Sequence, residues 1–512
     1  MRSQDDLRDE KDRLVDLGMI KSLPMSKHYR PWTPTQTYLL PPSPLEWLPE
    51  GHLAFFLLDV VASLDLSGIE QRIQQKDARG ERPYDPRMMT ALLLYAYCVG
   101  VFSSRRIARE TYEDVAFRVL CGEEHPHFTT VNQFRLDNRS ALSGLFMQVL
   151  KLCRRAGLVT LGHVSIDGTK VQANASKHKA MSYDRMREEE KKLAEEIQEL
   201  LHRADRKDEE EDARYGKGVV PEDLPEELRR REGRLARIRE AREALEREAA
   251  EARALELRDQ ARAQRAKAQD ESVDPVERKA AQTRSERREE KARELDGRGP
   301  DDEPPPPQSS DEALPTHQVP TTTDGEPKPK AQRNFTDPES RIMVRDGAYL
   351  QGFNAQIAVD EGSQVIVAEA LTNQAPDQEH LVPMVERVIA NCGEAPDVLT
   401  GDAGYFSQAN VEHCEQRGIL PVISVGRERP GEQLDAAAAK NTAAQRMRAR
   451  LRDPEGNRLY RRRKAITEPV FGQIKEARGF RRFLLRGLEK VRKEWSLLCL
   501  THNLLKLYRA TA

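Results

Sequence analysis

Two aspartates of this chain stand directly after short apolar runs and have a glycine close behind them. Asp167 lies in the segment VSIDGTK, and Asp402 lies in the segment VLTGDAGY. A carboxylate at the end of a strand projects beyond the sheet, where a turn leaves room for a substrate. A single Asp-Gly pair is more often a turn with no chemical role. Its recurrence after two separate strands indicates a shared site.

Two kinds of phosphate chemistry would suit Asp167. Haloacid-dehalogenase-like phosphatases carry Asp-x-Asp-Gly-Thr, in which the first aspartate is the nucleophile, and here Ser165 occupies that position. The segment lacks the nucleophile, so the phosphatase hypothesis fails. The other chemistry is metal-dependent cleavage of a phosphodiester, which needs two or three carboxylates around a pair of magnesium ions.

A third carboxylate, Glu468, stands in the most basic part of the chain. From Lys440 to Lys493 there are 18 Lys or Arg residues against 5 Asp or Glu residues, an excess of 13. Such an excess is expected where a protein contacts DNA phosphates, and a solvated charged face is the alternative. Pro469 favours the first turn of a helix. Lys475, two turns later, then falls on the same helical face as Glu468.

The sequence around these residues predicts an α/β domain. After about residue 333, NAQIAVD and QVIVAEAL alternate around a turn and predict a hairpin. DQEHLVPMVERVIANCG predicts an amphipathic helix, and DVLTGD and ILPVISV predict two more strands. The strand that carries Asp167 completes the sheet. We therefore expect a mixed sheet with flanking helices, interrupted by a long insertion.

The insertion, residues 183–298, has a composition of its own. Apolar residues recur there at spacings compatible with heptads, at Leu193, Ile197, Leu200, Leu228, Leu235, Ile238 and Leu245. This pattern predicts a helical hairpin or coiled coil with charged outer faces. The Pro-rich, acidic residues 299–332 are expected to form a disordered linker. Neither segment offers catalytic side chains, so the expected role is spacing, dimerisation or bracing of DNA.

The first 158 residues predict an arm followed by a helical domain. Residues 1–50 are charged and then Pro-rich, which is typical of an extended arm. Residues 51–158 are patterned as short helices with tight turns, as in helix-turn-helix-like modules that bind DNA. In such a module Gln133 and Arg135 would lie on a helix able to reach DNA. A helical domain used for packing or dimerisation is an equal alternative.

The bulk composition indicates a soluble, cytoplasmic protein. Hydrophobic residues make up 38% of the chain and charged residues 33%, against about a quarter charged in average chains. The longest apolar run, residues 88–102, is too short to cross a membrane, and the N-terminus has no apolar signal core. The six cysteines form no CxxC pair, which argues against a zinc site or disulfides.

Three segments together resemble the DDE transposases of bacterial insertion sequences. They are SIDGTKVQANAS, LTGDAGYFS and the long segment that runs from RRRKAITEPVFGQIKEARGFRR into the C-terminal helix. The resemblance extends from about residue 40 to the end and is nearest to the branch with an InsH-type N-terminal domain. It implies a DDE catalytic domain of RNase H-like fold, formed by residues 159–182 and 333–512.

The resemblance implies roles for the three acids. Asp167 and Asp402 match the first and second catalytic aspartates, and Glu468 matches the catalytic glutamate, which together would bind two Mg²⁺ ions or Mn²⁺ in their place. The implied reaction is hydrolysis at the transposon ends, followed by attack of the freed 3′-hydroxyl on target DNA, with no covalent protein–DNA intermediate. The implied partners are double-stranded DNA and further copies of the chain, as a homodimer or larger synaptic complex. The protein would be associated with the bacterial nucleoid when bound to DNA.

The related transposases also carry a Tyr, Arg, Glu, Lys signature around the last acid. Lys475 fits this signature, Lys464 takes the Arg position with Arg463 beside it, and Tyr460 stands one residue farther upstream than usual. These four residues are therefore expected to contact DNA. Two other functions remain open at this point: an inactive or domesticated DNA-binding coiled-coil protein, and an RNase H-like nuclease without strand transfer.

A few other positions are weaker candidates for the site. Asp337, in FTDPES, could line the cleft. Tyr405, just after Asp402, would either stack near an unpaired base or pack under the turn. His178, Asp184 and Asp377 are possible accessories for which a structural or surface role is the more common one.

Overall fold

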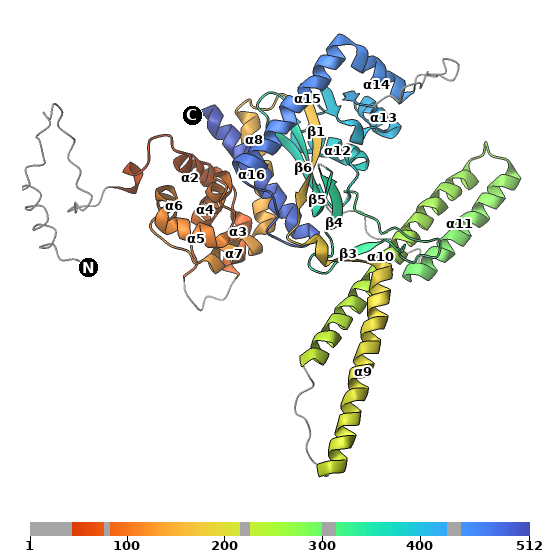
Figure 1. Ribbon diagram of the computed structural model, residues 1–512. Coiled ribbons are helices and arrows are strands. Elements are labelled where there is room, and N and C mark those ends of the chain that lie inside the picture. The colour runs from red at the N-terminus through yellow and green to blue at the C-terminus, as the bar shows by residue number, and fades with distance from the viewer. Residues whose placement is uncertain are drawn as a thin grey trace, which may run out of the picture. The chain divides into compact units, whose positions relative to one another are not determined.

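The computed structural model of the protein describes residues 43–75, 82–215, 226–298, 314–345, 347–426 and 442–511. Most of the expected N-terminal arm, residues 1–42, lies outside these described ranges. The described part combines a helical N-terminal region, a mixed sheet with flanking helices and a long inserted pair of helices (Figure 1). The α/β class and the inserted helical pair expected from the sequence are thereby confirmed.

Short helices build the N-terminal region. After a 3-10 turn, η1 (Pro44–Glu46), they are α2 (Leu53–Ser63), α3 (Ser67–Gln74), α4 (Pro86–Cys98), α5 (Ser104–Glu113), α6 (Val115–Cys121), α7 (Phe128–Asp137) and α8 (Arg139–Arg155). α4 contains most of the apolar run of residues 88–102 and is largely buried. Asp85 caps it by accepting hydrogen bonds from the amides of Arg87 and Met88, and Pro86 occupies the first turn, where no amide donor is needed.

The sheet has β1 at its centre. Its strands are β1 (His163–Gln172), β4 (Arg341–Arg345), β5 (Ala348–Asp360), β6 (Ile366–Thr372), β7 (Val398–Gly401) and β8 (Leu420–Ile423). The order is β4-β5-β1-β7-β8, with β6 also paired to β5. β1 is antiparallel to β5 and parallel to β7, which in turn is parallel to β8. This mixed sheet includes the hairpin β5–β6 that the alternating pattern predicted.

Helices cover the sheet and connect its strands. The 3-10 turn η3 (Gln378–His380) leads into α12 (Leu381–Cys392), which packs against β5 and β6. Between β7 and β8 the chain forms η4 (Ala403–Tyr405) and α13 (Gln408–Gln416). Gly393 and Gly418 follow the ends of α12 and α13, and they take the positive φ angles (77° and 75°) that glycine adopts without strain.

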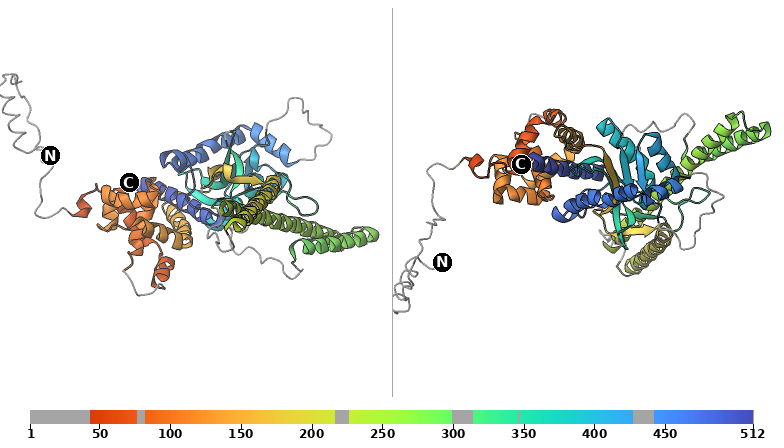
Figure 2. Two further views of the ribbon diagram at one scale, coloured as in Figure 1. Left: turned by 60° about the horizontal axis from the view of Figure 1, so that its bottom comes forward. Right: turned by 90° about the horizontal axis from the view of Figure 1, so that it is seen from above.

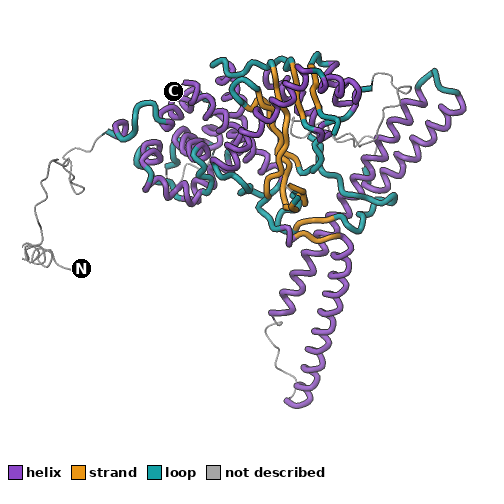
Figure 3. The backbone as a smooth tube through the Cα atoms, turned by 45° about the horizontal axis from the view of Figure 1, so that its top comes forward, coloured by secondary structure: helices purple, strands orange, loops and turns teal. Residues whose placement is uncertain are grey.

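The insertion leaves the sheet through a small two-stranded ladder. β2 (Ala180–Ser182) pairs with β3 (Gln332–Asn334) at the base of two long helices, as Figure 3 shows. These are α9 (Tyr183–Tyr215) and α10 (Glu226–Gln269), and α11 (Pro275–Asp296) packs against α10. The heptad residues meet inside the α9–α10 pair, where Leu193, Ile197, Leu235 and Ile238 form a common buried cluster.

The segment expected to be a disordered linker is structured in its second half. Residues 299–313 lie outside the described ranges, but from residue 314 onward the chain makes specific contacts. Leu314 and Val319 are buried, and the hydroxyl of Thr372 on β6 donates to the carbonyl of Pro315. Leu314 and Pro315 thus contact the sheet, and Val319 packs with Tyr183 and Leu245 at the base of the insertion, which composition alone did not indicate.

The C-terminal part of the chain is helical. It comprises α14 (Ala443–Arg452), α15 (Pro454–Gly472), the π-helical turn η5 (Gln473–Ala477) and α16 (Leu488–Thr511). Pro469 lies in the interior of α15, and the expectation that it stands in a first turn was wrong. Proline lacks the amide that would bond to the carbonyl of Ala465. The Gln364 side chain, from the β5–β6 turn, donates to that carbonyl at 2.9 Å instead.

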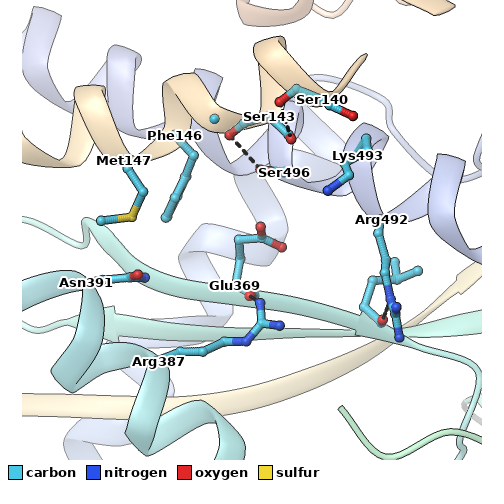
Figure 4. A pocket seen from close by; sticks show the side chains of 12 residues that line it. Ser140, Ser143, Phe146, Met147, Glu369, Arg387, Asn391, Arg492, Lys493 and Ser496 are labelled. Atoms are coloured by element: carbon cyan, nitrogen blue, oxygen red, sulfur yellow. Dashed lines mark hydrogen bonds between the residues drawn. The ribbon is translucent and has the colours of Figure 1, made fainter. Parts of the chain in front are cut away.

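α16 joins the helical region to the sheet. It runs beside α8 and also packs against β6 (Figure 2). Around this contact Arg387 of α12 and Arg492 of α16 each donate to a backbone carbonyl of β6, at 2.8 and 2.9 Å, and the Ser496 hydroxyl donates to the carbonyl of Ser143 on α8 at 3.3 Å. A cavity of about 330 Å³ remains between these side chains (Figure 4).

All six cysteines are buried, and none of them forms a disulfide. Burial raises the pKa of four of them, Cys98, Cys121, Cys153 and Cys414, to about 12, so they are protonated and pack as small apolar groups. None of the described helices combines the length and the apolar character that a membrane crossing requires.

Candidate active site

Parallel pairing brings the two predicted aspartates together. Ser165 of β1 is the register partner of Thr400 of β7, and each aspartate follows two residues later in the chain. Asp167 and Asp402 therefore stand next to each other at the same edge of the sheet. Their separation of 235 positions in the sequence (402 minus 167) is bridged by one strand-to-strand step.

Asp167 is held by the next residue of its own strand and by α15. Its Oδ1 accepts a hydrogen bond from the amide of Gly168, and its Oδ2 accepts one from the Thr467 hydroxyl, each at 2.9 Å. The Arg463 guanidinium lies 3.5 Å from the same Oδ2. Burial raises the pKa of the Asp167 carboxyl above 3.8. Thr467 and Arg463 oppose this shift, and the charge of Asp402 adds to it.

Asp402 is more accessible and forms the start of a turn. Its Oδ1 accepts a hydrogen bond from the amide of Gly404 at 2.9 Å, which caps η4. The carboxylate is only partly buried. It lies beside Asp167 without an ion pair among the described residues, so the two negative charges face each other with little compensation.

Glu468 is not gathered with the two aspartates. It lies on α15 directly after Thr467 and is exposed. Thr467 and Arg463 are four residues apart and so share the helix face that meets Asp167, whereas Glu468 points about 100° away around the helix. Among the described residues, no group of three acids, histidines or cysteines is arranged to hold a metal ion.

The two aspartates nevertheless fit a divalent cation. Mg²⁺ prefers carboxylate oxygens, and Asp167 and Asp402 supply two carboxylates whose mutual repulsion helps to raise the pKa of Asp167. A cation between them would remove that repulsion. Glu468 would complete the set only after its side chain, or the end of α15, turned toward the aspartates.

A polar network around β1 and β5 supports this edge. Asp377 accepts hydrogen bonds from Gln356 and Asn354, each at 2.7 Å, and from the Lys170 ammonium at 3.0 Å. Gly168 leaves the space for it, because a Cβ there would stand 2.4 Å from the Gln356 amide and 2.9 Å from the Asp377 carboxylate. A larger residue after Asp167 would therefore have to displace the ends of the Gln356 and Asp377 side chains. The sequence pattern suggested only a minor role for Asp377 and did not reveal its partners.

Tyr405 belongs to the same network. It is fully buried, and its hydroxyl donates to the Gln356 side chain. Burial raises the pKa of the Tyr405 hydroxyl well above 10, and the charges of Asp377, Asp167 and Asp402 add to the shift. Of the two alternatives for Tyr405, packing under the turn is the one that the structure has.

Two basic residues of the C-terminal signature reach β1. Lys475, in η5, donates to the hydroxyl of Thr169, two residues beyond Asp167, and its ammonium lies 5.4 Å from the centre of the Phe471 ring. Arg463 contacts Asp167 and lies 5.6 Å from the centre of the Tyr460 ring. Lys464, by contrast, is exposed on α15.

The two candidate residues of the helical region lie in different environments. Gln133 is exposed on α7 and donates to Asp137 at 2.5 Å. Arg135 is only 7% exposed, and it donates to the Tyr97 hydroxyl at 3.2 Å and to the carbonyl of Phe102 at 3.1 Å. Arg135 thus has an interior, bracing position that its sequence pattern did not indicate.

The weaker candidates are spread over the molecule. Asp337 is fully buried and accepts a hydrogen bond from the amide of Gly487, just before α16. Asp184 is exposed in the first turn of α9. His178 is exposed in the loop that follows β1.

Two family models match parts of the chain. Residues 43–137 match the model described as Transposase domain (DUF772), and residues 412–508 match the model described as Transposase DDE domain. The second match contains Glu468 and Lys475, and it begins after Asp402, so both aspartates lie outside it. No curated protein and no solved structure matches the chain.

Proposed function

We propose that the chain is a transposase with an InsH-type N-terminal domain and a DDE domain, which binds the terminal inverted repeats of its element and catalyses DNA strand cleavage and strand transfer; the two family matches support the proposal. The observation that carries the proposal is the side-by-side placement of Asp167 and Asp402 under the basic helix α15. A pair of adjacent carboxylates beneath a cationic helix suits a reaction on a phosphodiester.

In this proposal the three acids Asp167, Asp402 and Glu468 hold divalent metal. When bound, Mg²⁺ would activate the attacking oxygen and stabilise the leaving oxygen of the phosphodiester. Arg463 and Thr467 position the Asp167 carboxylate through the contacts described above. In this composite site the sheet supplies the two aspartates, and α15 supplies the third acid, Glu468.

Cations near the site bind the DNA backbone in the proposal. Lys464, exposed on α15, and Lys475, beside β1, are placed to contact phosphates on either side of the reacting bond. Removing one phosphate contact should lower the slope of log binding constant against log salt by about 0.9 for duplex DNA. Lys464→Ala is expected to show this decrease without a change in sequence preference.

In the proposal, the N-terminal helical region recognises the terminal repeats. Gln133 is exposed on α7, and a glutamine side chain can pair with an adenine edge in the major groove. Arg135 is left out because its guanidinium is engaged in the interior. We further propose that two or more copies of the chain assemble around the paired ends.

The deciding test is nicking of DNA that carries the element's own flanking sequences, with Mg²⁺ or Mn²⁺ present. Glu468→Gln should abolish nicking and leave binding of the same DNA nearly unchanged, because it removes a metal ligand and little basic surface. Glu455→Gln is the matched control, since Glu455 is also an exposed acid on α15 but lies in its first turn. Nicking that survives in Glu468→Gln would exclude Glu468 as the third acid.

The exposed position of Glu468 favours one second candidate, a DNA-binding transposase copy that has lost catalysis. The same experiment distinguishes it. Specific binding of the terminal DNA without nicking by the wild-type protein in either metal would support the inactive copy. Nicking without joining of the 3′ end to target DNA would instead support a nuclease that lacks strand transfer.

A further inference from the structure

A cavity of about 650 Å³ lies beyond the end of β1. Four segments line it: the end of β1 with the residues that follow it, the stretch between β3 and β4, the beginning of β5, and the stretch between η5 and α16. Gln172, the last residue of β1, lies in the wall, and its backbone bridges to Arg482. The cavity is therefore built on the same strand that carries Asp167.

The lining of this cavity is positively charged. Among the described residues it contains Lys177, Lys179, Arg482 and Arg486, together with His178, and no Asp or Glu. All four Lys and Arg residues are exposed, and none of them makes an ion pair with another described residue. Arg486 is held in place by donating to the carbonyl of Asn174 at 3.0 Å. We call this site the basic cavity. The charge of Arg486 acts on the buried Asp337 carboxylate, whereas no acid stands in the described lining. An excess of cations at one site attracts an anionic ligand.

The other large cavities are not of this kind. One of about 410 Å³ has four arginines in its wall but also four acids, and the two sets pair with one another, as in Arg258 with Asp296 and Arg341 with Glu248. In the cavity of Figure 4, Arg387 and Arg492 donate to carbonyls of β6. Among these three cavities, the basic cavity is the one whose positive charge is left for a ligand.

An aromatic ring stands at the wall of the basic cavity. Tyr349 of β5 is 65% exposed, and no other ring contacts it among the described residues. Tyr112 has a similar exposure, 62%, but its ring stacks on His125 with 3.8 Å between the centroids. An exposed ring beside a cationic groove is the combination by which proteins bind single-stranded nucleic acid, through base stacking and phosphate contacts.

The position of the basic cavity relates it to the reaction. Gln172 is five residues beyond Asp167 on β1, which corresponds to about 16 Å at the usual rise of a strand. Lys475, in contact with Thr169, lies between them. Positively charged side chains are thus found along β1 from the aspartates to the basic cavity. A DNA strand that is cut at the aspartates would pass into the cavity within a few nucleotides.

We propose that the basic cavity binds single-stranded DNA next to the phosphodiester that is cut, with the backbone on Lys177, Lys179, Arg482 and Arg486 and an unpaired base stacked on Tyr349. The link to cutting rests on the proposed function. The binding itself can be measured without any cleavage, so the two proposals can fail separately.

The test is the affinity of the full-length protein for fluorescent oligothymidylate and for a fully paired duplex of the same length, by anisotropy in EDTA. Tyr349→Ala should weaken oligothymidylate binding about tenfold, the effect expected for one base–aromatic stack. Tyr349→Phe should keep the affinity, because the ring remains. Duplex binding should change little in either variant. Tyr112→Ala, which removes an exposed tyrosine elsewhere, is the control.

A second measurement tests the phosphate contacts. The double variant Lys177→Ala, Arg482→Ala should lower the salt slope for oligothymidylate by about 1.4, which is two contacts at about 0.7 each for single strands. Lys191→Ala combined with Lys279→Ala removes two exposed lysines from the insertion and should leave the slope unchanged. Thermal unfolding of every variant shows whether its fold is intact.

Several results would overturn the proposal. They are a wild-type protein that does not bind oligothymidylate, an unchanged affinity in Tyr349→Ala, an equal weakening on duplex, or an unchanged slope in the double variant. None of these results bears on nicking of the terminal DNA. Conversely, a protein that fails to nick but shows the expected binding differences would refute the proposed function and retain the cavity as a single-strand site.

Discussion

The mixed sheet and the helical insertion differ in how their charged side chains are paired. In the insertion, acids and arginines are paired: Glu190 accepts from Arg239 and Arg242 at 2.8 Å each, and Arg258 forms two hydrogen bonds with Asp296. At the sheet edge, Asp167 and Asp402 stand side by side with Arg463 as a 3.5 Å partner of one of them.

This contrast indicates where chemistry lies in a chain that is one-third charged. Paired charges in the insertion stabilise helices that have a narrow apolar core, and they leave no ligand for a metal or for DNA. By contrast, Asp402 and the four Lys and Arg residues of the basic cavity make no ion pair among the described residues, so they are available to a ligand. The unpaired groups are therefore the candidates for function.

The sharpest test neutralises one acid in each region. Asp402→Asn should lower terminal-DNA nicking about a thousandfold, because a metal ligand contributes several kcal/mol to the transition state. The asparagine oxygen can still accept from the Gly404 amide, so thermal stability should change little. Glu190→Gln should leave nicking unchanged and loosen the α9–α10 pair, as measured by hydrogen exchange.

Asp397→Asn serves as a control for the first variant, because Asp397 is an exposed acid at the opposite end of β7. If Asp397→Asn and Asp402→Asn reduced nicking equally, the decrease would come from disturbance of β7 and not from a missing ligand. The contrast between the two regions would also break down if Glu190→Gln abolished nicking.

Truncation of the apolar core of the insertion should separate its stability from that of the sheet. Leu193 is 4% exposed inside the α9–α10 cluster, so Leu193→Ala should destabilise that pair by about 2–5 kcal/mol. Hydrogen exchange should increase in α9 and α10 and stay constant in β1 and β7. Equal increases in both regions would mean that the insertion and the sheet unfold together.

The buried ion pair between α10 and α11 should make this part of the molecule sensitive to acid. Burial would raise the pKa of Asp296, but the hydrogen bonds from Arg258 and the Arg298 amide outweigh it, and the pKa lies below 3.8. The pair therefore stabilises α10–α11 fully above about pH 3.8, and this contribution is lost as the pH falls through the lower, folded-state pKa.

Asp296→Asn should remove the same contribution at neutral pH, about 1.5–3 kcal/mol for hydrogen bonds to a charged group. Its readout is faster amide exchange in α10 and α11 than in the wild type at neutral pH. Below the pKa of Asp296 the two proteins should exchange alike. A difference that persisted in acid would show that packing, and not the ionised carboxylate, was responsible.

The smallest effect is that of salt on the outer pairs of the insertion. Arg234 and Glu189 are 57% and 22% exposed, and such a pair contributes about 0.2–1 kcal/mol. Raising the salt concentration should increase exchange slightly in α9 and α10, because exposed charges are screened. The sheet, whose core is apolar, should not respond in the same direction.

Local elements were predictable where their signals were local. The alternation of NAQIAVD and the amphipathic run DQEHLVPMVERVIANCG each report on a few neighbouring residues, and the structure has the strand and the helix that they predict. The prediction that Pro469 stands in a first turn was wrong because the effect of this proline depends on Gln364, which is 105 positions away (469 minus 364). Gln364 satisfies the carbonyl that proline leaves open, and the helix continues.

Arg135 and Asp377 show the same dependence on distant partners. Nothing near Arg135 in sequence reveals that Tyr97 and Phe102 will enclose its guanidinium. Asp377 gains its place only when β1 and β5 pair and bring Lys170 and Gln356 to it. Burial and pairing are properties of packed elements, so residue type and spacing do not reveal them.

Short-range patterns in the chain were enough to specify the types of element, the two strand ends that carry Asp and Gly, the segregated basic segment and the charged helical insertion. Which charges meet depended on packing. Parallel pairing of β1 with β7 set Asp167 beside Asp402, the packing of α15 turned Thr467 and not Glu468 toward them, and the basic cavity was formed from four segments. Strand pairing and helix packing fix these relative positions through contacts between residues hundreds of positions apart, and no local pattern records such contacts.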